Sequence, residues 1–329
     1  MAQTQQAQWH VRPMAVGAEI VDFPAGMEER PGVQAALYDA WLTHGILLFR
    51  NIASVEQHLA ISRCFGELEI HPVPEVRSKS NPYLIELGAP IAGGGRQPTV
   101  YSFDGETRIN RIAWHRDTAY TPDICKGAML RMLEVPDTAG ETLLADTAMA
   151  WDDLPADIRA KLEHLEFKAT IRTAHMSTLG RPGVFWKSVV LAGDADYPGN
   201  SELSRRDGAI DARYPSVIQP AVLTHPESGR KCLFLSPTYV DRFLGMEQEE
   251  SDALLRRLTE HMLQPRYVYR HKWQANDAII WDNRRFMHAG MGNRPGEPRF
   301  GLRTTLAGPL RTGRYFDENA KAVPIELTD

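Results

Sequence analysis

The sequence predicts a mostly β protein with flanking helices, whose strands form an antiparallel double sheet or barrel. From Trp114 onward, short runs rich in β-branched and aromatic residues follow one another, without the regular helix alternation of a parallel α/β fold. No segment repeats at a fixed period, which argues against a solenoid or a propeller. At 329 residues the chain is long enough for one large β domain with insertions, and we expect a single domain over residues 1–329.

The first third of the chain alternates helical and strand patterns. Apolar residues at helical spacing predict a helix over Gly32–Thr43, the run ILLF predicts a strand over Ile46–Phe49, and a second helix follows over Val55–Cys64. We expect these three elements to form one edge of the fold. The segment 88–98, GAPIAGGGRQP, is rich in glycine and proline, which predicts a flexible surface loop.

Beyond Trp114 two helical patterns interrupt the short β-type runs. They cover Ala148–His164 and Glu247–Leu263. The predicted strands are Ala128–Leu133, Thr142–Ala145, Phe167–Arg172, Ala221–Thr224, Lys231–Leu235, Tyr267–His271, Ala278–Trp281 and Arg299–Leu306. The segment 178–216 is rich in Gly, Pro, Asp and Arg, and we expect it to be an insertion, either a lid or surface decoration.

The composition is that of an ordinary globular protein, with 43% hydrophobic and 24% charged residues. A formal net charge of −5 and scattered basic residues argue against a nucleic-acid partner. No apolar run approaches the roughly 20 residues of a membrane helix, and no signal peptide is evident, so we expect a cytoplasmic protein without a membrane partner. Cys64, Cys125 and Cys232 are too few and too widely spaced for a disulfide framework or a thiolate zinc site.

Common nucleophile and nucleotide signatures are missing from the sequence. It has no G-x-S-x-G, no Walker loop and no H-E-x-x-H, and residues 93–98 do not complete G-x-G-x-x-G. A histidine followed two residues later by a carboxylate does occur, but about as often as chance allows. The three pairs are His115/Asp117, His164/Glu166 and His225/Glu227.

Local context favours only the first pair as part of a metal site. His164 lies in a predicted amphipathic helix, where residues two apart point to nearly opposite sides. His225 lies in a predicted turn, where we expect Glu227 to face water. In IAWHRDTAY the aromatic and β-branched flanks predict an extended segment, so His115 and Asp117 project from the same face, about 7 Å apart.

A third ligand is needed to complete such a site. Two imidazoles and one carboxylate on one face, with three open positions, are typical of Fe(II). Among the remaining histidines, context favours His288, because it follows the strand-like AIIWDN and precedes a segment that ends in RFGLRTT. The arginines of that segment, Arg299 and Arg303, are four residues apart and could bind anions.

These segments resemble the taurine dioxygenase family of Fe(II)/2-oxoglutarate oxygenases. The similarity extends in the family's order over nearly the whole chain, through VGAEIVDF, GILLFRNI, CFGELEIHPV, IAWHRDTAY, VPDTAGETLLADTAMAWDDLP, THPESGRKCLFLSP, AIIWDNRRFMHAG and RFGLRTTLAG. It implies a double-stranded β-helix core, the jelly-roll or cupin-like fold. It also implies an oxidoreductase that oxidises a C–H bond of a small, anionic organic substrate with 2-oxoglutarate and O2 as cosubstrates, releasing succinate and CO2, with hydroxylation as the expected outcome.

The resemblance also implies roles for individual residues. His115, Asp117 and His288 match the family's iron ligands. Arg299 matches the arginine that pairs with the distal carboxylate of 2-oxoglutarate, and Thr142 matches a threonine that hydrogen-bonds the same cosubstrate. No further catalytic residue is implied beyond this metal centre.

Substrate contacts carry over less directly. His71 and Arg303 match positions that meet the sulfonate in the taurine enzyme, and Thr118 and Tyr120 follow the metal motif into the same pocket. Some neighbouring residues are expected only to frame the site. These residues are Trp114, Trp281, Asp282 and Asn283.

Two departures from the taurine enzyme argue against taurine as the substrate. Arg108 and Arg111 stand where that enzyme presents neutral amides, and the segment 178–216 adds Phe185 and Trp186. A larger organic acid with an aromatic or polycyclic body fits equally well. The alternatives are a desaturase or epoxidase of the same family in natural-product biosynthesis, or a non-catalytic metal-binding module on this scaffold. Assembly as a homo-oligomer is also left open.

Overall fold

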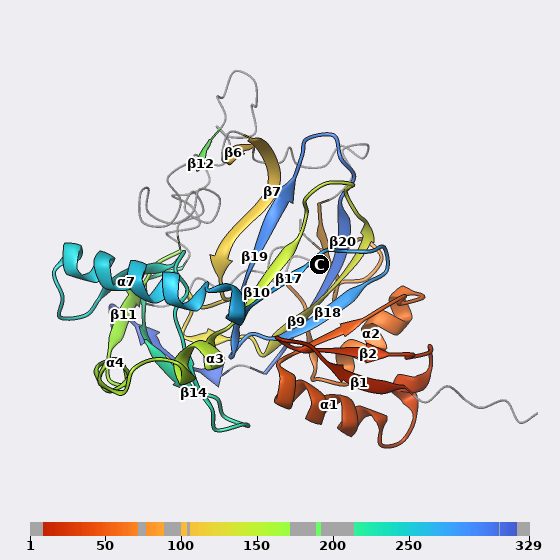
Figure 1. The fold of residues 1–329 in the computed structure, drawn as a ribbon, viewed down its shortest axis with the longest axis horizontal. Helices are drawn as coiled ribbons and strands as arrows, with labels where there is room; N and C mark the ends of the chain where they lie inside the picture. Colours follow the sequence, from red (N-terminus) through yellow and green to blue (C-terminus); the bar gives the residue numbers. More distant parts are fainter. Residues whose placement is uncertain are drawn as a thin grey trace, which may run out of the picture.

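Two large β-sheets form the core of the fold, and the helices lie outside them (Figure 1). The structure is a computed structural model, which describes residues 9–71, 77–88, 100–103, 106–171, 189–191, 214–308 and 310–320. The predicted class, mostly β with flanking helices, is confirmed. Most of the predicted loop at 88–98 and of the predicted insertion at 178–216 lies outside the described residues, so both of these, and the single-domain organisation, stay predictions.

The first sheet holds eight strands, which pair antiparallel except for β2 with β3. Their order is β1 (His10–Pro13), β2 (Ala18–Val21), β3 (Ile46–Phe49), β18 (Ala278–Asp282), β9 (Gly127–Glu134), β20 (Phe300–Leu306) and β4 (Leu68–Glu69), with β5 (Ile85–Leu87) also paired to β20. Arg303 lies in β20 of this sheet.

The second sheet holds six antiparallel strands and carries two of the predicted metal ligands. Their order is β12 (Val189–Leu191), β6 (Tyr101–Phe103), β7 (Glu106–His115), β19 (Phe286–Asn293), β10 (Thr142–Asp146) and β17 (Val268–His271). His115 is the last residue of β7, and His288 lies near the start of β19.

Smaller sheets complete the β structure. The four-stranded sheet runs β16 (Val240–Phe243), β11 (Glu166–Ala169), β13 (Val217–Pro220) and β22 (Arg314–Tyr315). The two-stranded sheets pair β14 (Val222–Thr224) with β15 (Lys231–Leu233), and β21 (Leu310–Arg311) with β8 (Asp123–Ile124).

The helices gather in two groups (Figure 1). The first group packs beside the β1–β2–β3 edge and consists of η1 (Met27–Glu29), α1 (Val33–His44) and α2 (Val55–Arg63). The second group packs near the four-stranded sheet and consists of α3 (Thr147–Asp152), α4 (Ala156–Leu162), α7 (Gln248–Met262) and η4 (Pro265–Tyr267). The predicted helix–strand–helix edge, α1–β3–α2, is confirmed.

Strand β3 shows why the first sheet is buried on both faces. Leu47 and Phe49 pack with Trp41 of α1 on the outer face, whereas Ile46 and Leu48 pack in a cluster that also contains residues of the second sheet. Alternate residues of a strand point to opposite faces. The continuous apolar run ILLF therefore reflects a strand with a helix layer on one side and the second sheet on the other.

The prediction of one helix over Ala148–His164 is wrong, because the structure has two helices, α3 and α4. The break lies at Pro155, which has no N–H to donate and disfavours the helical conformation in the residue before it. Asp146 caps α3, since its carboxylate accepts hydrogen bonds from the backbone N–H groups of Ala148 and Met149. The predicted strand Phe167–Arg172 is also too long, as β11 ends at Ala169.

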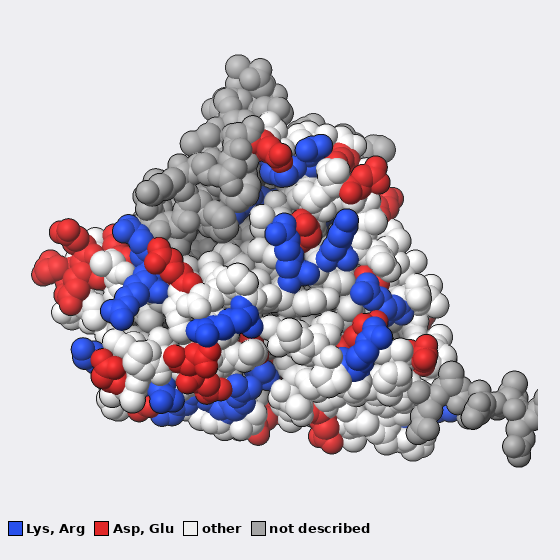
Figure 2. Space-filling view, in the orientation of Figure 1, with Lys and Arg blue, Asp and Glu red and all other residues white. Residues whose placement is uncertain are grey.

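The described surface is mixed in charge. On the face drawn in Figure 2, basic and acidic side chains are interspersed rather than gathered into one basic area. Within the part of the chain that the structure describes, no helix combines the length and the apolar character needed to cross a membrane. The three cysteines are free and buried, and burial raises the pKa of Cys64 to about 11 and that of Cys232 to about 12.

Two glycines that flank α1 predict different responses to substitution. Gly32 and Gly45 both have positive φ, +80° and +74°, but an added Cβ at Gly32 meets nothing within 4 Å, whereas at Gly45 it would clash with the ring of Phe286. We expect Gly32→Ala to cost about 1–2 kcal/mol from the left-handed backbone alone. Gly45→Ala should cost about 1–3 kcal/mol more, because it also overpacks the core. Urea denaturation of both variants measures the difference, and equal losses would contradict it.

Candidate metal centre

The pairing of β7 with β19 brings the predicted metal ligands together. His115 and His288 are direct cross-strand partners, and Asp117 follows two residues after His115. One ligand atom from each of the three residues can be chosen so that all lie within 4.8 Å of one another. The sequence-predicted triad thus forms one cluster, and its side chains are buried or nearly so.

A hydrogen bond orients the His115 ring for metal binding. Its Nδ1 lies 2.7 Å from the carbonyl oxygen of Ala113. Because a carbonyl can only accept, Nδ1 carries the proton, and Nε2 keeps a free lone pair. That Nε2 lies 3.5 Å from Asp117 Oδ1, and Nε2 of His288 lies 3.8 Å from Asp117 Oδ2. Both imidazoles therefore present Nε2 toward the same carboxylate.

The charges of the cluster also suit a metal cation. Burial alone would raise the pKa of Asp117, but Arg303 and the two histidines outweigh it and hold that pKa well below its usual range. Burial, assisted by His115, lowers the pKa of His288 well below its usual value. Asp117 is thus ionised and His288 neutral near pH 7, which are the protonation states that metal ligands require. The donor set fits Fe(II).

An amide clamps the backbone of Asp117 from the neighbouring turn. The side-chain oxygen of Asn283 accepts a hydrogen bond from Asp117 N at 2.9 Å, and its Nδ2 donates to Asp117 O at 2.9 Å. Trp281 flanks the cluster, with its ring centroid 4.8 Å from that of His288. Asp282 accepts from Arg284. These contacts agree with the prediction that Trp281, Asp282 and Asn283 frame the site.

Arg299 is a buried cation with no partner among the described residues. It is 8% exposed, its Nε has no hydrogen bond, and no ion pair to it is formed within the described ranges. Burial lowers its pKa to about 10, so it is still charged at neutral pH. Burying an uncompensated charge is costly, so the guanidinium fits an anion that enters from outside the chain.

The segment that leads into Thr142 passes close to Arg299. A Cβ at Gly140, two residues before Thr142, would lie 3.9 Å from Cδ of Arg299. Thr142 is buried, and its Oγ1 accepts a hydrogen bond from Nε1 of Trp273 at 3.0 Å. The acceptor role leaves the hydroxyl proton of Thr142 available to a ligand.

Arg303 occupies a different position from Arg299. Its Nη2 lies 2.5 Å from Asp117 Oδ2, and its guanidinium carbon lies 5.6 Å from the centroid of the Trp281 ring. Arg303 therefore contacts a predicted metal ligand directly. A substrate anion bound by Arg303 would therefore share this guanidinium with Asp117.

Aromatic side chains line the other side of the cluster. The Tyr120 ring lies 5.1 Å from that of Tyr239 and 5.2 Å from that of Tyr214, and Tyr239 lies 6.4 Å from the His115 ring. Sequence reasoning identified Tyr120 but missed Tyr214 and Tyr239, because nothing in their local sequence ties them to the metal motif. The three tyrosines form a continuous apolar wall next to His115.

The remaining predicted substrate residues have mainly local contacts among those described. Thr118 has a φ of +57°, and its Oγ1 accepts a hydrogen bond from Cys125 N at 2.8 Å, which stabilises the turn after Asp117. The carbonyl oxygen of His71 accepts from Nε of Arg77 at 2.6 Å. Arg108 pairs with Glu106 at the start of β7. Phe185 and Trp186 lie outside the described residues.

Among the residues that the structure describes, the other two histidine–carboxylate pairs do not belong to a cluster that could hold a metal ion, and their predicted local structures were partly wrong. His164 lies after the end of α4, and Glu166 begins β11 and pairs with Arg314, so the expected single helix does not exist. Glu227 does not simply face water, because it forms an ion pair with Arg284. His225 lies in the predicted turn, and its Nε2 lies 2.8 Å from Asp282 Oδ2.

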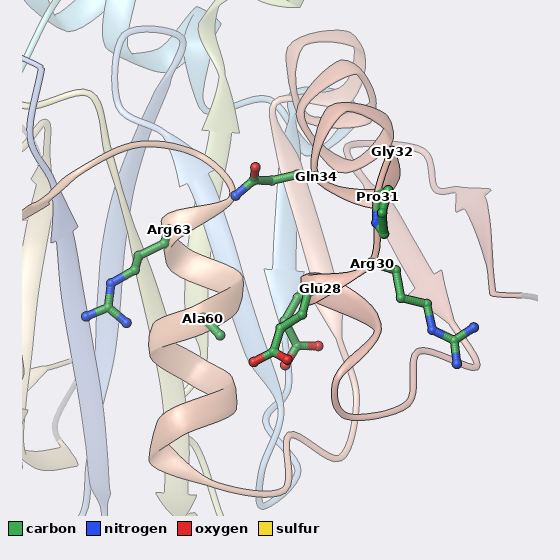
Figure 3. Close-up of a pocket in the computed structure, with 8 residues that line it drawn as sticks. Glu28, Arg30, Pro31, Gly32, Gln34, Ala60 and Arg63 are labelled. Carbon is green, nitrogen blue, oxygen red and sulfur yellow. The ribbon is translucent and has the colours of Figure 1, made fainter.

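A separate hollow lies between η1, α1 and α2 (Figure 3). Its lining includes Glu28, Arg30, Gln34 and Arg63. None of the predicted site residues lines this hollow, so the candidate metal centre is a different place in the fold.

Comparison with known proteins identifies the family. The family model described as taurine catabolism dioxygenase TauD, TfdA family matches residues 10–305. The chain therefore belongs to the TauD/TfdA family of dioxygenases. It is an oxidoreductase that depends on 2-oxoglutarate (alpha-ketoglutarate) and O2, and the predicted family and enzyme class are confirmed.

Several relatives cover most of the chain. The alkylsulfatase of Acinetobacter baylyi is 27% identical over 99% of this chain and 92% of its own length. The alpha-ketoglutarate-dependent 2,4-dichlorophenoxyacetate dioxygenase of Cupriavidus pinatubonensis is 32% identical over 74% of this chain and 78% of its own. The (S)-phenoxypropionate/alpha-ketoglutarate-dioxygenase of Sphingobium herbicidovorans is 31% identical over 77% of this chain and 78% of its own length.

Solved structures support the fold. A taurine dioxygenase from Burkholderia xenovorans matches with a TM-score of 0.69 at 24% identity over 96% of each chain. AAD-2 in complex with Mn(II) and N-oxalylglycine matches with a TM-score of 0.66 at 23% identity over 93% of this chain and 99% of its own. The predicted jelly-roll core is thereby confirmed.

Removing the carboxylate should abolish metal binding without unfolding the chain. For the wild type, Mn(II) at 100 times its dissociation constant should raise the free energy of unfolding by about 2.7 kcal/mol. Asp117→Ala should remain folded, but Mn(II) should no longer raise its free energy of unfolding, because one of the three ligands is gone. Thermal melting with and without Mn(II) measures it, and Asp123→Ala, which removes a carboxylate paired with Arg311, is the control. An Asp117→Ala chain that Mn(II) still stabilises would remove Asp117 from the ligand set.

Proposed function

We propose that His115, Asp117 and His288 bind Fe(II), and that the enzyme hydroxylates a C–H bond of a small organic anion. The overall reaction converts the substrate, 2-oxoglutarate and O2 into the hydroxylated product, succinate and CO2. When bound, ferrous iron supplies the redox chemistry that couples this decarboxylation to oxidation of the substrate. The observation that carries the proposal is the cluster of three ligand atoms within 4.8 Å, formed in a fold whose relatives are dioxygenases.

Arg299 and Thr142 are the residues we assign to 2-oxoglutarate. The planar guanidinium of Arg299 can donate two parallel hydrogen bonds to a carboxylate, and it has no other partner in the described part of the chain. Thr142 can donate from its hydroxyl while Trp273 holds that oxygen in place. Together they would bind the distal carboxylate and fix the cosubstrate in one orientation.

His71, Thr118, Tyr120 and Arg303 are the residues we assign to the substrate. Arg303 supplies positive charge beside the metal centre, and Tyr120 belongs to the tyrosine wall next to His115. This combination favours an organic anion with an apolar or aromatic body. The names of relatives point the same way, since they include phenoxypropionate, 2,4-dichlorophenoxyacetate and sulfate ester dioxygenases.

The alternatives are less well supported. A non-catalytic metal-binding module would not need a buried Arg299 that has no partner among the described residues. A desaturase or epoxidase of the same family would use the same residues, so the identity of the product separates it from a hydroxylase. The cytoplasmic location and a homo-oligomeric state stay predictions.

The test is succinate formation stimulated by a candidate substrate. The protein is incubated with Fe(II), ascorbate and 2-oxoglutarate under O2, with a panel of alkyl sulfates, sulfonates and phenoxy acids. We expect one class to raise succinate release and to yield a product that is heavier by one oxygen atom. If the hydroxylated carbon also bears the sulfate, sulfonate or phenoxy group, we expect the carbonyl compound and the sulfate, sulfite or phenol into which that product breaks. Succinate release in Asp117→Ala that equals that of the wild type would contradict the proposal, and a product that has lost two hydrogens would favour the desaturase.

Replacing the Arg299 fork should weaken cosubstrate binding. Arg299→Lys keeps the charge but loses the bidentate geometry, so we expect the KM for 2-oxoglutarate to rise about tenfold, which corresponds to about 1.4 kcal/mol. Steady-state kinetics at saturating substrate measures it. Arg311→Lys, at an exposed arginine of β21, should leave the KM unchanged. An unaltered KM in Arg299→Lys would exclude the assigned role.

A further inference from the structure

Arg116 lies between two predicted metal ligands and is fully buried. Its exposed fraction is 0%, and no carboxylate lies within ion-pair distance of it among the described residues. Its guanidinium instead donates to uncharged oxygen atoms from several segments of the chain. The acceptors are Asn283 O at 2.8 Å, Phe286 O at 3.0 Å, Leu233 O at 2.8 Å, Thr147 Oγ1 at 2.6 Å and, more weakly, Arg285 O at 3.5 Å.

These contacts link the segment that carries His115 and Asp117 to the segment that carries His288. Arg116 follows the last residue of β7, and its guanidinium reaches the turn before β19 and the strand β15. The acceptor carbonyl of Asn283 belongs to the turn that leads into β19. That of Phe286 belongs to the first residue of β19, and His288 follows two residues later. The guanidinium therefore joins the segment of His115 and Asp117 to the start of the strand that carries His288.

Other hydrogen bonds fix the same stretch of backbone. The backbone N–H of Arg116 donates to Oγ of Ser236 at 3.0 Å, and the Asn283 amide binds both the N–H and the carbonyl oxygen of the next residue, Asp117. Burying a charge without a counter-ion is costly. An apolar side chain could fill the same space without that cost, but it could not donate these hydrogen bonds. The side chain of Arg116 thus provides a connection that an apolar side chain would not.

We propose that Arg116 is a positioning residue of the metal centre. It holds the turn before β19 at a fixed distance from the segment after β7, so that His288 faces His115 and Asp117 before any metal binds. The inference rests on the proposed function, since it presupposes that these three residues bind a divalent cation.

Equilibrium binding of Mn(II) to the full-length protein tests this role apart from activity. Arg116→Lys keeps a positive charge but cannot reach all of the acceptors, and we expect it to bind Mn(II) about 10- to 100-fold more weakly than the wild type. Free Mn(II) measured by electron paramagnetic resonance gives the affinity, and thermal melting without metal gives the loss of stability.

Arg131→Lys is the matched control. Arg131 is also buried, at 4% exposed, and donates to Asn276 Oδ1 at 2.7 Å, but it lies in β9 of the first sheet. We expect Arg131→Lys to lower stability while leaving the Mn(II) affinity of the wild type intact. Wild-type affinity in a folded Arg116→Lys, or an equal loss of affinity in both variants, would overturn the inference.

Thr147→Ala covers the case in which Arg116→Lys does not fold. It removes one acceptor of the Arg116 guanidinium, Thr147 Oγ1, and we expect a severalfold weaker Mn(II) affinity in a folded chain. Unchanged affinity in a folded Thr147→Ala would then overturn the inference. A wild-type chain that binds no Mn(II) would overturn the proposed function first, and this inference with it.

Discussion

The antiparallel register between β7 and β19 determines the geometry of the metal centre. It places His115 opposite His288 at the end of β7, and the two rings lie 4.2 Å apart between centroids. The pairing is irregular between His288 and Gly290. A shift of the register by one residue would turn His288 to the other face of the sheet, so every property of the cluster depends on this pairing.

The electrostatics of the site follow from that geometry. Burial next to a second imidazole keeps His288 neutral, and the nearby guanidinium of Arg303 keeps Asp117 ionised. Arg299, just before β20, and Arg303, within it, then differ in function because of their partners. Arg303 is already paired with a carboxylate of the chain, whereas Arg299 has none among the residues described. We therefore assign the binding of an external carboxylate to Arg299.

Most of the fold, and the three residues that the structure brings together in the cluster, could be predicted from the sequence for identifiable physical reasons. Strands such as Ile46–Phe49 are buried on both faces and so are recognisable as continuous apolar runs. His115 and Asp117 could be paired because they are neighbours in sequence, although the predicted extended segment ends at His115 and Asp117 lies in the turn that follows. The break at Pro155 was missed although it is also local, since the apolar periodicity continues through it.

Other features depend on contacts between distant segments and could not be predicted from local patterns. The tyrosine wall joins Tyr120, Tyr214 and Tyr239, which come from three separate segments. Arg116 was also missed, because its acceptors lie far along the chain and only the folded structure shows them. The ion pair of Glu227 with Arg284 has the same origin.

A crystal structure of the full chain with Mn(II) and 2-oxoglutarate tests the central claim most directly. The account predicts one metal ion bound by Nε2 of His115, a carboxylate oxygen of Asp117 and Nε2 of His288, with the distal carboxylate of 2-oxoglutarate on the Arg299 guanidinium. A metal ion bound without His288, or a cosubstrate that leaves Arg299 unpartnered, would contradict it.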